Sequence, residues 1–351
     1  MIRKGRIPLL AAGHGINDLL AGYFLGSMAQ SGQDLLKIGL GLFMYNLLAF
    51  GGQYPAALWI EKQRNTKPFL LGAFALNLAA ATLFSFAPAA AILFAGIASA
   101  IYHVAGGSIC AGEKKAAGIG LFAAPGVAGL MAGGYFAWSG FQLTGILVLV
   151  SFFFLVLLRL MDIPERTAMT DSGTQPASPG PDRHDLIMIL LLTVIALRSA
   201  VWNIFQLIHE NNYSWLIPIA AAAFAGKIAG GWLADRIGWR LYTFISLAAA
   251  TPLVSFFRNE LLLFCIGVGL LQSGIPATTA MLIQATKGKT ERGIGLSFGT
   301  AIIIGGITFT LPPGLFSQHL WLPVLLISAV LLLLLIAVRK DHHHITGRLN
   351  N

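Results

Sequence analysis

The chain has 351 residues, of which 56% are hydrophobic and only 11% are charged. A soluble globular domain carries about 25% charged residues because its surface faces water, so this composition excludes an ordinary soluble protein. The net charge of +9 comes from basic residues in short loops, which argues against a nucleic-acid partner.

Twelve apolar segments follow one another along the chain, each close to the roughly 20 residues that a helix needs to cross a bilayer. They cover residues 7–30, 36–59, 69–87, 89–112, 115–137 and 141–161, and then residues 186–208, 214–234, 240–257, 260–286, 293–316 and 321–338. Polar residues interrupt the first segment, so we interpret it as a retained helix and not as a cleaved signal peptide.

The stretch between the two sets is rich in Ser, Thr and Pro, which is typical of a flexible linker. The sequence therefore predicts an all-α membrane fold of twelve transmembrane helices. We expect one six-helix bundle over residues 1–161, a cytoplasmic linker over residues 162–185 and a second six-helix bundle over residues 186–351.

The basic residues predict the orientation of these spans. If the N-terminus is cytoplasmic, 19 of the 23 Lys and Arg residues lie on the cytoplasmic side, and only Lys37 and Arg258 lie on the other. Arg198 and Lys227 fall within spans. Because cytoplasmic loops of membrane proteins are enriched in basic residues, we expect a bacterial inner-membrane protein with both termini in the cytoplasm.

The two halves contain similar segments at equivalent positions. Residues 118–121 and residues 293–296 both read Gly-Ile-Gly-Leu, and each follows a basic loop and opens the fifth span of its half. Two parallel copies of six spans, related by a pseudo-two-fold axis, resemble the arrangement of the major facilitator superfamily.

The loop after the eighth span reads GGWLADRIGWR over residues 230–240. It is similar to G-x-L-x-D-R-x-G-R, a loop signature of the same superfamily. The equivalent loop of the first half is a degenerate copy, with Ala57 at the Gly position and Glu61 at the Asp position. The resemblance implies a conformational latch that stabilises one state of an alternating-access cycle, formed by Gly231, Asp235, Arg236, Arg240 and Glu61.

Two shorter segments are similar to motifs of one subgroup. Residues 13–18, GHGIND, match its H-x-x-N-D, and residues 96–103, GIASAIYH, match most of its G-x-x-S-S-x-F-H-P. Val104 and Ala105 replace the Pro and Glu that follow that His. The chain thus resembles fosmidomycin-resistance-type transporters, which implies export of a solute without identifying it.

Asp18 is the only acidic residue deep inside a span, where a charge costs roughly 2.5–3.5 kcal/mol. It lies about 18 Å from the cytoplasmic end of its helix, near the bilayer midplane. His14 precedes it by one helical turn, and His103 lies at a similar depth in the fourth span. Because a histidine beside a carboxylate can hold or release a proton near neutral pH, we predict that Asp18, His14 and His103 couple transport to protons.

An alternative treats the same three side chains as metal ligands, since imidazole and carboxylate suit divalent metals. The set lacks a cysteine or a second carboxylate, which argues against it. We therefore expect neither a metal nor a cofactor.

Arg198 lies at the depth of Asp18 in the seventh span, which is the equivalent of the first span. Trp202 and Gln206 follow it at four-residue intervals and share its helix face. We predict that a small, anionic or amphipathic solute binds at Arg198, Asn17, Trp202, Asn203 and Gln206. The alternative is that Arg198 only neutralises Asp18 as a structural ion pair.

These features favour a proton-coupled secondary transporter, most simply an exporter that works as a monomer in the lipid bilayer. Uptake of a nutrient or a metal complex by the same fold is an alternative. A non-transporting lipid scramblase or sensor is another. We find no Ser–His, paired-carboxylate or metalloprotease pattern, so we do not expect an enzyme.

Overall fold

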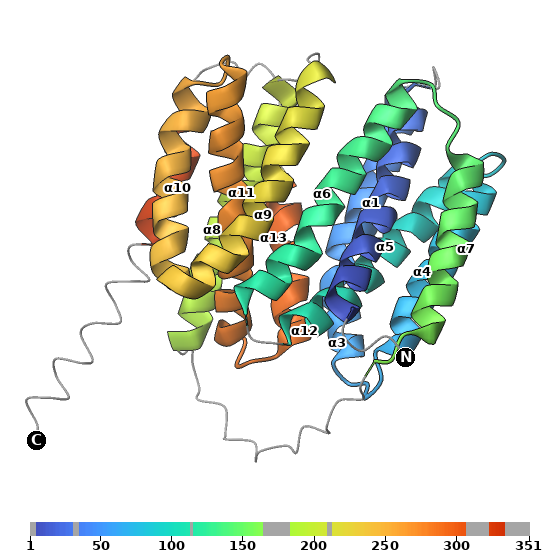
Figure 1. The fold of residues 1–351 in the computed structure, drawn as a ribbon, viewed down its shortest axis with the longest axis horizontal. Coiled ribbons are helices and arrows are strands. Elements are labelled where there is room, and N and C mark those ends of the chain that lie inside the picture. The colour runs from blue at the N-terminus through green and yellow to red at the C-terminus, as the bar shows by residue number, and fades with distance from the viewer. Residues whose placement is uncertain are drawn as a thin grey trace, which may run out of the picture.

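The structure is a computed structural model, and it describes residues 5–30, 35–112, 115–163, 183–208, 213–306 and 323–333. These residues form helices joined by short turns, with no strand among them. Figure 1 shows the helices side by side in two groups, with α6 and α9 where the groups meet.

Five of the six spans in the first group are single helices. They are α1 (Arg6–Gln30), α4 (Lys67–Leu83), α5 (Pro88–Ala111), α6 (Ala116–Trp138) and α7 (Thr144–Leu160). The second span is instead made of α2 (Leu35–Asn46), the π-helical η1 (Leu47–Gly51) and α3 (Gln53–Ile60).

The second group repeats this plan. It contains α8 (Arg183–Ile208), α9 (Leu216–Ile237) after the short 3-10 helix η2 (Tyr213–Trp215), α10 (Trp239–Phe256), α11 (Leu261–Ala285) and the helix Pro323–Leu333. Its fifth span begins with α12 (Thr290–Ile294), the π-helical η3 (Gly295–Thr300) and α13 (Ala301–Gly306).

All twelve expected spans contain helix, which confirms the predicted fold class. Residues 307–316, 321–322 and 334–338 of the last two spans lie outside the described residues, as do residues 164–182 of the expected linker. The expectation of one continuous helix over residues 36–59 differs from the structure. A π-helical segment interrupts it, and such segments are common at functional sites.

Five described helices are long and apolar enough to cross a membrane by themselves: Pro88–Ala111, Ala116–Trp138, Asp185–Ile204, Leu216–Ile237 and Leu261–Ala285. Shorter apolar helices lie at Lys67–Leu83, Thr144–Leu160 and Pro323–Leu333. The helix α1 has the required length, but His14, Asn17 and Asp18 in its middle lower its mean hydropathy.

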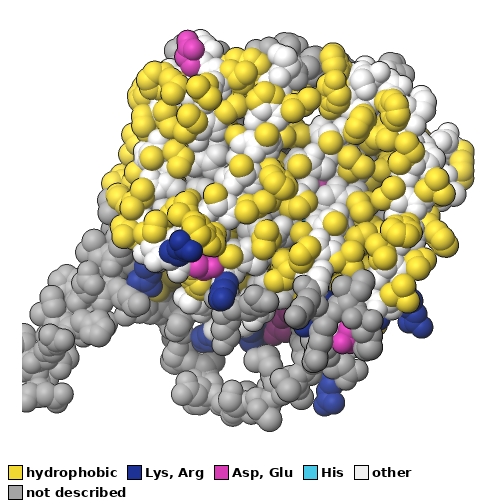
Figure 2. Space-filling view, in the orientation of Figure 1, with side chains coloured by type: hydrophobic (Ala, Val, Ile, Leu, Met, Phe, Trp, Pro, Cys, Tyr) yellow, Lys and Arg dark blue, Asp and Glu magenta, His cyan; other side chains and the backbone are white. Residues whose placement is uncertain are grey.

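The outer surface is apolar over the height of these helices. Figure 2 shows hydrophobic side chains across the visible face, with Lys and Arg gathered at one end. Large apolar side chains such as Leu149, Phe256 and Leu262 are at least 70% exposed. Lipid is the environment in which such a surface is stable, so the chain is a multi-pass membrane protein.

Small residues let the central helices approach one another closely. A Cβ atom at Gly22 of α1, or at Gly129 of α6, would clash with the backbone of the facing helix. Gly120 of α6 lies directly against the backbone of Lys227 in α9, so the same device joins the two halves. Membrane helices use small residues in this way because lipid offers no hydrophobic drive for their association.

Candidate functional site: a buried histidine pair with an aspartate

The polar residues of α1 lie on the side of the helix that faces α5 and α6. His14 and Asn17 are buried, and Asp18 has a side chain that is 14% exposed. His14 and Asp18 are one turn apart, so their side chains extend along the same face. Inside the membrane such groups must be hydrogen-bonded, because no bulk water is present to satisfy them.

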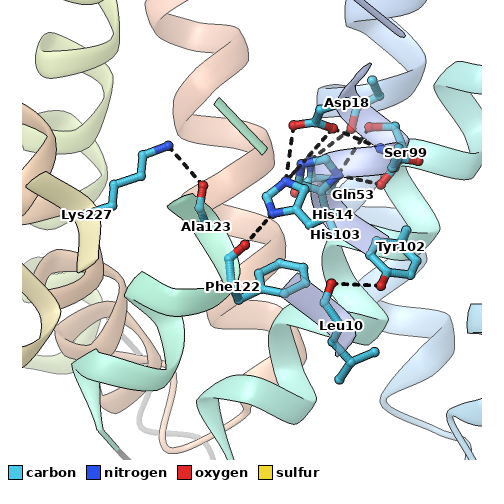
Figure 3. A network of polar contacts seen from close by, with 12 residues as sticks. Leu10, His14, Asp18, Gln53, Ser99, Tyr102, His103, Phe122, Ala123 and Lys227 are labelled. Carbon is cyan, nitrogen blue, oxygen red and sulfur yellow. Dashed lines mark hydrogen bonds and ion pairs between the residues drawn. The ribbon is translucent and has the colours of Figure 1, made fainter. Parts of the chain in front are cut away.

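The two histidines meet between α1 and α5. The Nε2 atoms of His14 and His103 are 2.8 Å apart, and their rings stand nearly perpendicular, as Figure 3 shows. The other nitrogen of each ring forms a hydrogen bond with a backbone carbonyl. His14 Nδ1 lies 2.7 Å from the oxygen of Phe122, and His103 Nδ1 lies 2.7 Å from the oxygen of Ser99.

These contacts assign a hydrogen-bond role to each ring nitrogen. A carbonyl oxygen only accepts hydrogen bonds, so the Nδ1 atom of each ring carries a hydrogen. A neutral imidazole has one N–H, so both Nε2 atoms would then present lone pairs to each other. Two acceptors at 2.8 Å repel unless a cation lies between them. One extra proton, shared by His14 and His103, satisfies the geometry.

Asp18 supplies the negative charge for that proton. Its Oδ2 atom lies 3.2 Å from Nε2 of His14, and its Oδ1 atom lies 3.8 Å from Nε2 of His103. Asn17 donates to Oδ1 of Asp18 at 2.9 Å, and Asn77 of α4 donates to Oδ1 of Asn17 at 3.0 Å. The carboxylate is therefore held in place by a chain of amides that runs from α4.

The helix α6 forms the wall of the site. The ring of Phe122 stacks on His14 with centroids 4.5 Å apart. A Cβ atom at Gly126 would lie 2.5 Å from Cε1 of His14 and 2.7 Å from Oδ2 of Asp18. Only glycine at this position leaves room for the ion pair.

Lys227 of α9 reaches this wall from the second half. Its ammonium donates to the carbonyl of Ala123 at 3.3 Å, one residue from the carbonyl that holds His14, as Figure 3 shows. The ammonium is also close enough to interact electrostatically with both Asp18 and Arg198. Lys227 falls within a span, and the structure directs its side chain towards the wall of the histidine pair.

The structure does not pair Arg198 with Asp18. The side chain of Arg198 is buried and donates to the hydroxyl of Thr278 in α11 at 3.2 Å. Among the described residues, no carboxylate lies within ion-pair distance of its guanidinium. A buried cation without a counterion is costly, so this position favours an anion.

The other residues of the predicted binding site make contacts of their own. Asn17 belongs to the hydrogen bonds of Asp18 in the first half. Asn203 donates to the carbonyl of Gly305 within the second half, and Trp202 of α8 is partly buried against the apolar core of that half. The side chain of Gln206 lies outside the described residues.

Two contacts join the halves at the end that carries the basic loops. Asp235, in the last turn of α9, accepts hydrogen bonds from the first two N–H groups of α6, those of Ala116 and Ala117, at 2.9 and 3.0 Å. A carboxylate there satisfies unpaired N–H groups and the positive end of the helix dipole. Gly231 permits the contact, because a Cβ atom would lie 2.7 Å from the oxygen of Ala116.

The first half makes an equivalent contact in spite of its degenerate motif. Glu61 lies 2.5 Å from Nε of Arg292, in α12, and 3.4 Å from the ammonium of Lys289, just before that helix. Of the other predicted latch residues, Arg236 lies over the ring of Trp232, 3.5 Å from its centroid. Arg240 is partly buried at the start of α10, and none of the contacts between the halves described above involves it.

Sequence reasoning missed several members of these networks. Asn77 is the only amide in its apolar span, which is a signal that could have been followed. The carbonyl oxygens of Phe122 and Ser99 carry no such signal, because every residue has one. The pairing of Glu61 with Arg292 bridges 231 positions, which no local pattern reveals.

Comparisons with known proteins agree with this architecture. No family model matches the sequence, and no curated protein matches it. Several solved structures, however, superpose on this chain. The crystal structure of the transporter FucP in an outward conformation superposes with a TM-score of 0.72 at 13% identity, covering 93% of this chain and 97% of FucP. The chain has the fold of the major facilitator superfamily.

Other solved structures with this fold also match over nearly their full length. The human organic anion transporter MFSD10 gives a TM-score of 0.68 at 12% identity, covering 95% of this chain and 100% of MFSD10. A bacterial homologue of the iron transporter ferroportin, in an outward-facing state, gives 0.61 at 13% identity, covering 95% of this chain and 98% of the homologue. The major facilitator fold predicted from the repeat and the loop motif is thereby confirmed, while the subgroup stays a prediction.

Proposed function

We propose that the chain is a proton-coupled secondary transporter that exports a small organic anion across the bacterial inner membrane by alternating access. The basic end of the molecule is its cytoplasmic end, with both termini there, and the protein works as a monomer. Proteins described as a fucose:proton symporter and an organic anion transporter have this fold, which supports the class of function.

The observation that carries the proposal is the contact between the two histidines. Because both Nδ1 atoms donate to carbonyls, the 2.8 Å contact between the Nε2 atoms needs a shared proton. Loss of that proton would leave two facing lone pairs and the uncompensated charge of Asp18. The site would then open, so proton binding and helix packing are linked, which is the requirement for proton coupling.

Arg198 supports an anion as the solute. Its guanidinium is buried without a carboxylate in the described residues, and Lys227 adds a second positive charge from α9. An anion that binds there interacts with groups of the second half, while the proton binds in the first half. Each ligand would thus favour particular arrangements of the two halves.

The contacts of Asp235 and Glu61 support alternating access. Both join the halves at the basic end, and both use groups near a helix terminus that can separate without breaking the core of either half. A structure with these contacts formed is closed at its basic end. Their release would open the cytoplasmic side.

The test begins with the solute. Small organic anions are screened for thermal stabilisation of the purified protein, since a ligand that binds the native state stabilises it by mass action. Arg198→Gln should lose this stabilisation, whereas Arg159→Gln, which changes an exposed arginine in the last turn of α7, should keep it. Equal stabilisation of both variants would show that Arg198 does not bind the anion.

Transport of that anion is then measured in proteoliposomes with an imposed pH gradient. Asp18→Asn should abolish the response to the gradient, and Asp185→Asn, at the first turn of α8, should preserve it. Unchanged pH-driven transport in the Asp18→Asn protein would refute the role of Asp18. Export requires that solute and proton move in opposite directions, so movement in the same direction would favour uptake instead.

A further inference from the structure

The three side chains that hold the shared proton also form a set of metal ligands. Nε2 of His14, Nε2 of His103 and a carboxylate oxygen of Asp18 lie within 4.8 Å of one another. Two imidazoles and one carboxylate come from α1 and α5, which place them around one point. We propose that this cluster binds a divalent transition-metal ion, best represented by Zn²⁺, in place of the proton.

The distances suit such an ion. Zn²⁺ binds nitrogen and oxygen at about 2.0–2.2 Å with tetrahedral geometry, which sets its ligands about 3.4 Å apart. The separations here are 2.8 Å for the two histidines, 3.2 Å for His14 and Asp18, and 3.8 Å for His103 and Asp18. Movements of about half an ångström bring all three to the required spacing.

The surroundings of the ligands support the proposal independently. In metal sites the second ring nitrogen of a histidine typically donates to a carbonyl or a carboxylate, which fixes the ring and leaves the first nitrogen free to bind. Both histidines are held in this way, by the carbonyls of Phe122 and Ser99. Asn17 orients the carboxylate of Asp18 through a bond of 2.9 Å. The ligands are therefore already in the orientation that a metal requires, and only the shared proton has to leave.

The donor set also selects the metal. Imidazole nitrogen favours Zn²⁺, Co²⁺ and Ni²⁺, whereas Mg²⁺ and Ca²⁺ prefer sites built of oxygen. Three protein ligands leave a fourth position for water or a solute, as in open zinc sites. Lys227 is the charged group that faces the cluster from α9, and its ammonium is held on the carbonyl of Ala123.

Binding exchanges one ion for one proton. The metal forms bonds to both Nε2 atoms and to Asp18, and the proton shared by the histidines leaves to the solvent. The ion then fixes α1 to α5 in the arrangement seen here. A metal ion at this position should therefore inhibit any transport that requires the proton to leave.

Cobalt binding tests the proposal directly, because Co²⁺ in a site with nitrogen ligands absorbs visible light whereas Zn²⁺ does not. The full chain is purified with His342, His343 and His344 replaced by Ala, since a run of three histidines would itself bind metal. One equivalent of Co²⁺ should produce visible bands, and one equivalent of Zn²⁺ should abolish them. Absence of the bands in this protein would overturn the proposal.

Single substitutions then locate the ion. In the same background, His103→Gln and His14→Gln should each weaken Co²⁺ binding at least tenfold, and His184→Gln, at the first turn of α8, should leave it unchanged. Unchanged affinity in a folded His103→Gln protein would contradict the assignment. If neither site variant folds, Asp18→Asn in the same background takes their place and should likewise weaken Co²⁺ binding.

Binding and transport are read separately. Failure to bind Co²⁺ would leave proton coupling untouched, because the metal measurement involves no gradient. Unchanged pH-driven transport in Asp18→Asn would in turn refute the role of Asp18 in proton coupling and leave the cobalt spectrum of the parent protein unaffected. Inhibition of pH-driven transport in the parent protein at the Zn²⁺ concentration that displaces bound Co²⁺ would link the two.

Discussion

The space beside His14 and Asp18 is so limited that Gly126→Ala should disrupt the site. The new Cβ atom would lie 2.7 Å from Oδ2 of Asp18, whereas an ordinary contact begins near 3.4 Å. Because the backbones of α1 and α6 are in close contact elsewhere, the side chains must yield by about 0.7 Å. The distance between Nε2 of His14 and Oδ2 of Asp18, which is 3.2 Å, would then increase towards the 4 Å limit of an ion pair.

The expected cost follows from overpacking, which destabilises a well-packed interior by about 1–3 kcal/mol. Replacement of Gly by Ala also adds helix propensity of up to about 1 kcal/mol, so a control must contain the same change. Gly134→Ala provides it, because Gly134 lies in the same helix and its Cβ atom would meet nothing within 4 Å. The difference between the two variants isolates the clash.

The assay compares thermal unfolding of the two purified variants and their pH-driven transport in proteoliposomes. Gly126→Ala should unfold at a lower temperature than Gly134→Ala and should lose its response to the pH gradient. Equal stability and equal coupling in the two proteins would refute the claim that Gly126 makes room for the ion pair.

Three further changes test the surrounding contacts. Asp235→Asn should weaken the hydrogen bonds at the start of α6 by about 1 kcal/mol, so hydrogen exchange should be about fivefold faster at the first amides of that helix. Unchanged exchange would contradict the contact. Gly299→Ala should push the halves apart at the basic end, because its Cβ atom would lie 2.7 Å from a side chain of α3, whereas Gly306→Ala should not. Pulsed EPR between spin labels on the two halves measures the separation, and equal distances in the two variants would argue against this effect. Asn77→Ala should lower stability by about 1–3 kcal/mol in thermal unfolding, because the buried oxygen of Asn17 loses its donor, and a protein as stable as the parent would exclude that bond.

The helical architecture could be predicted almost entirely from the sequence. A bilayer imposes a fixed thickness and forbids unsatisfied backbone groups, so apolar length alone locates each span. The same constraint draws attention to Asp18 and His14, since charged or polar side chains are rare at that depth. Their proximity also follows locally, because residues four apart share a helix face.

The partners of these residues depended on the tertiary structure. Residues from α1, α5 and α6 meet only when three helices pack, and the decisive groups on Phe122 and Ser99 are backbone carbonyls that no side-chain pattern marks. The depth of Arg198 suggested a pair with Asp18, yet equal depth says nothing about the direction in which a side chain points. Packing directs Arg198 to Thr278 and Asp18 to the histidines.

In the loops, too, the sequence predicted that a contact would form, and the tertiary structure decided its partner. The signature in residues 230–240 predicted a contact at the basic end, but its partner is the N-terminus of α6, which lies about 120 residues earlier in the chain. Glu61 looked like the remnant of a lost motif, yet it meets Lys289 and Arg292 because the two halves close against each other. Sequence determined which groups are costly to place in a membrane, and tertiary packing decided which neighbours offset that cost, because contacts between helices distant in the chain follow from shape and not from local pattern.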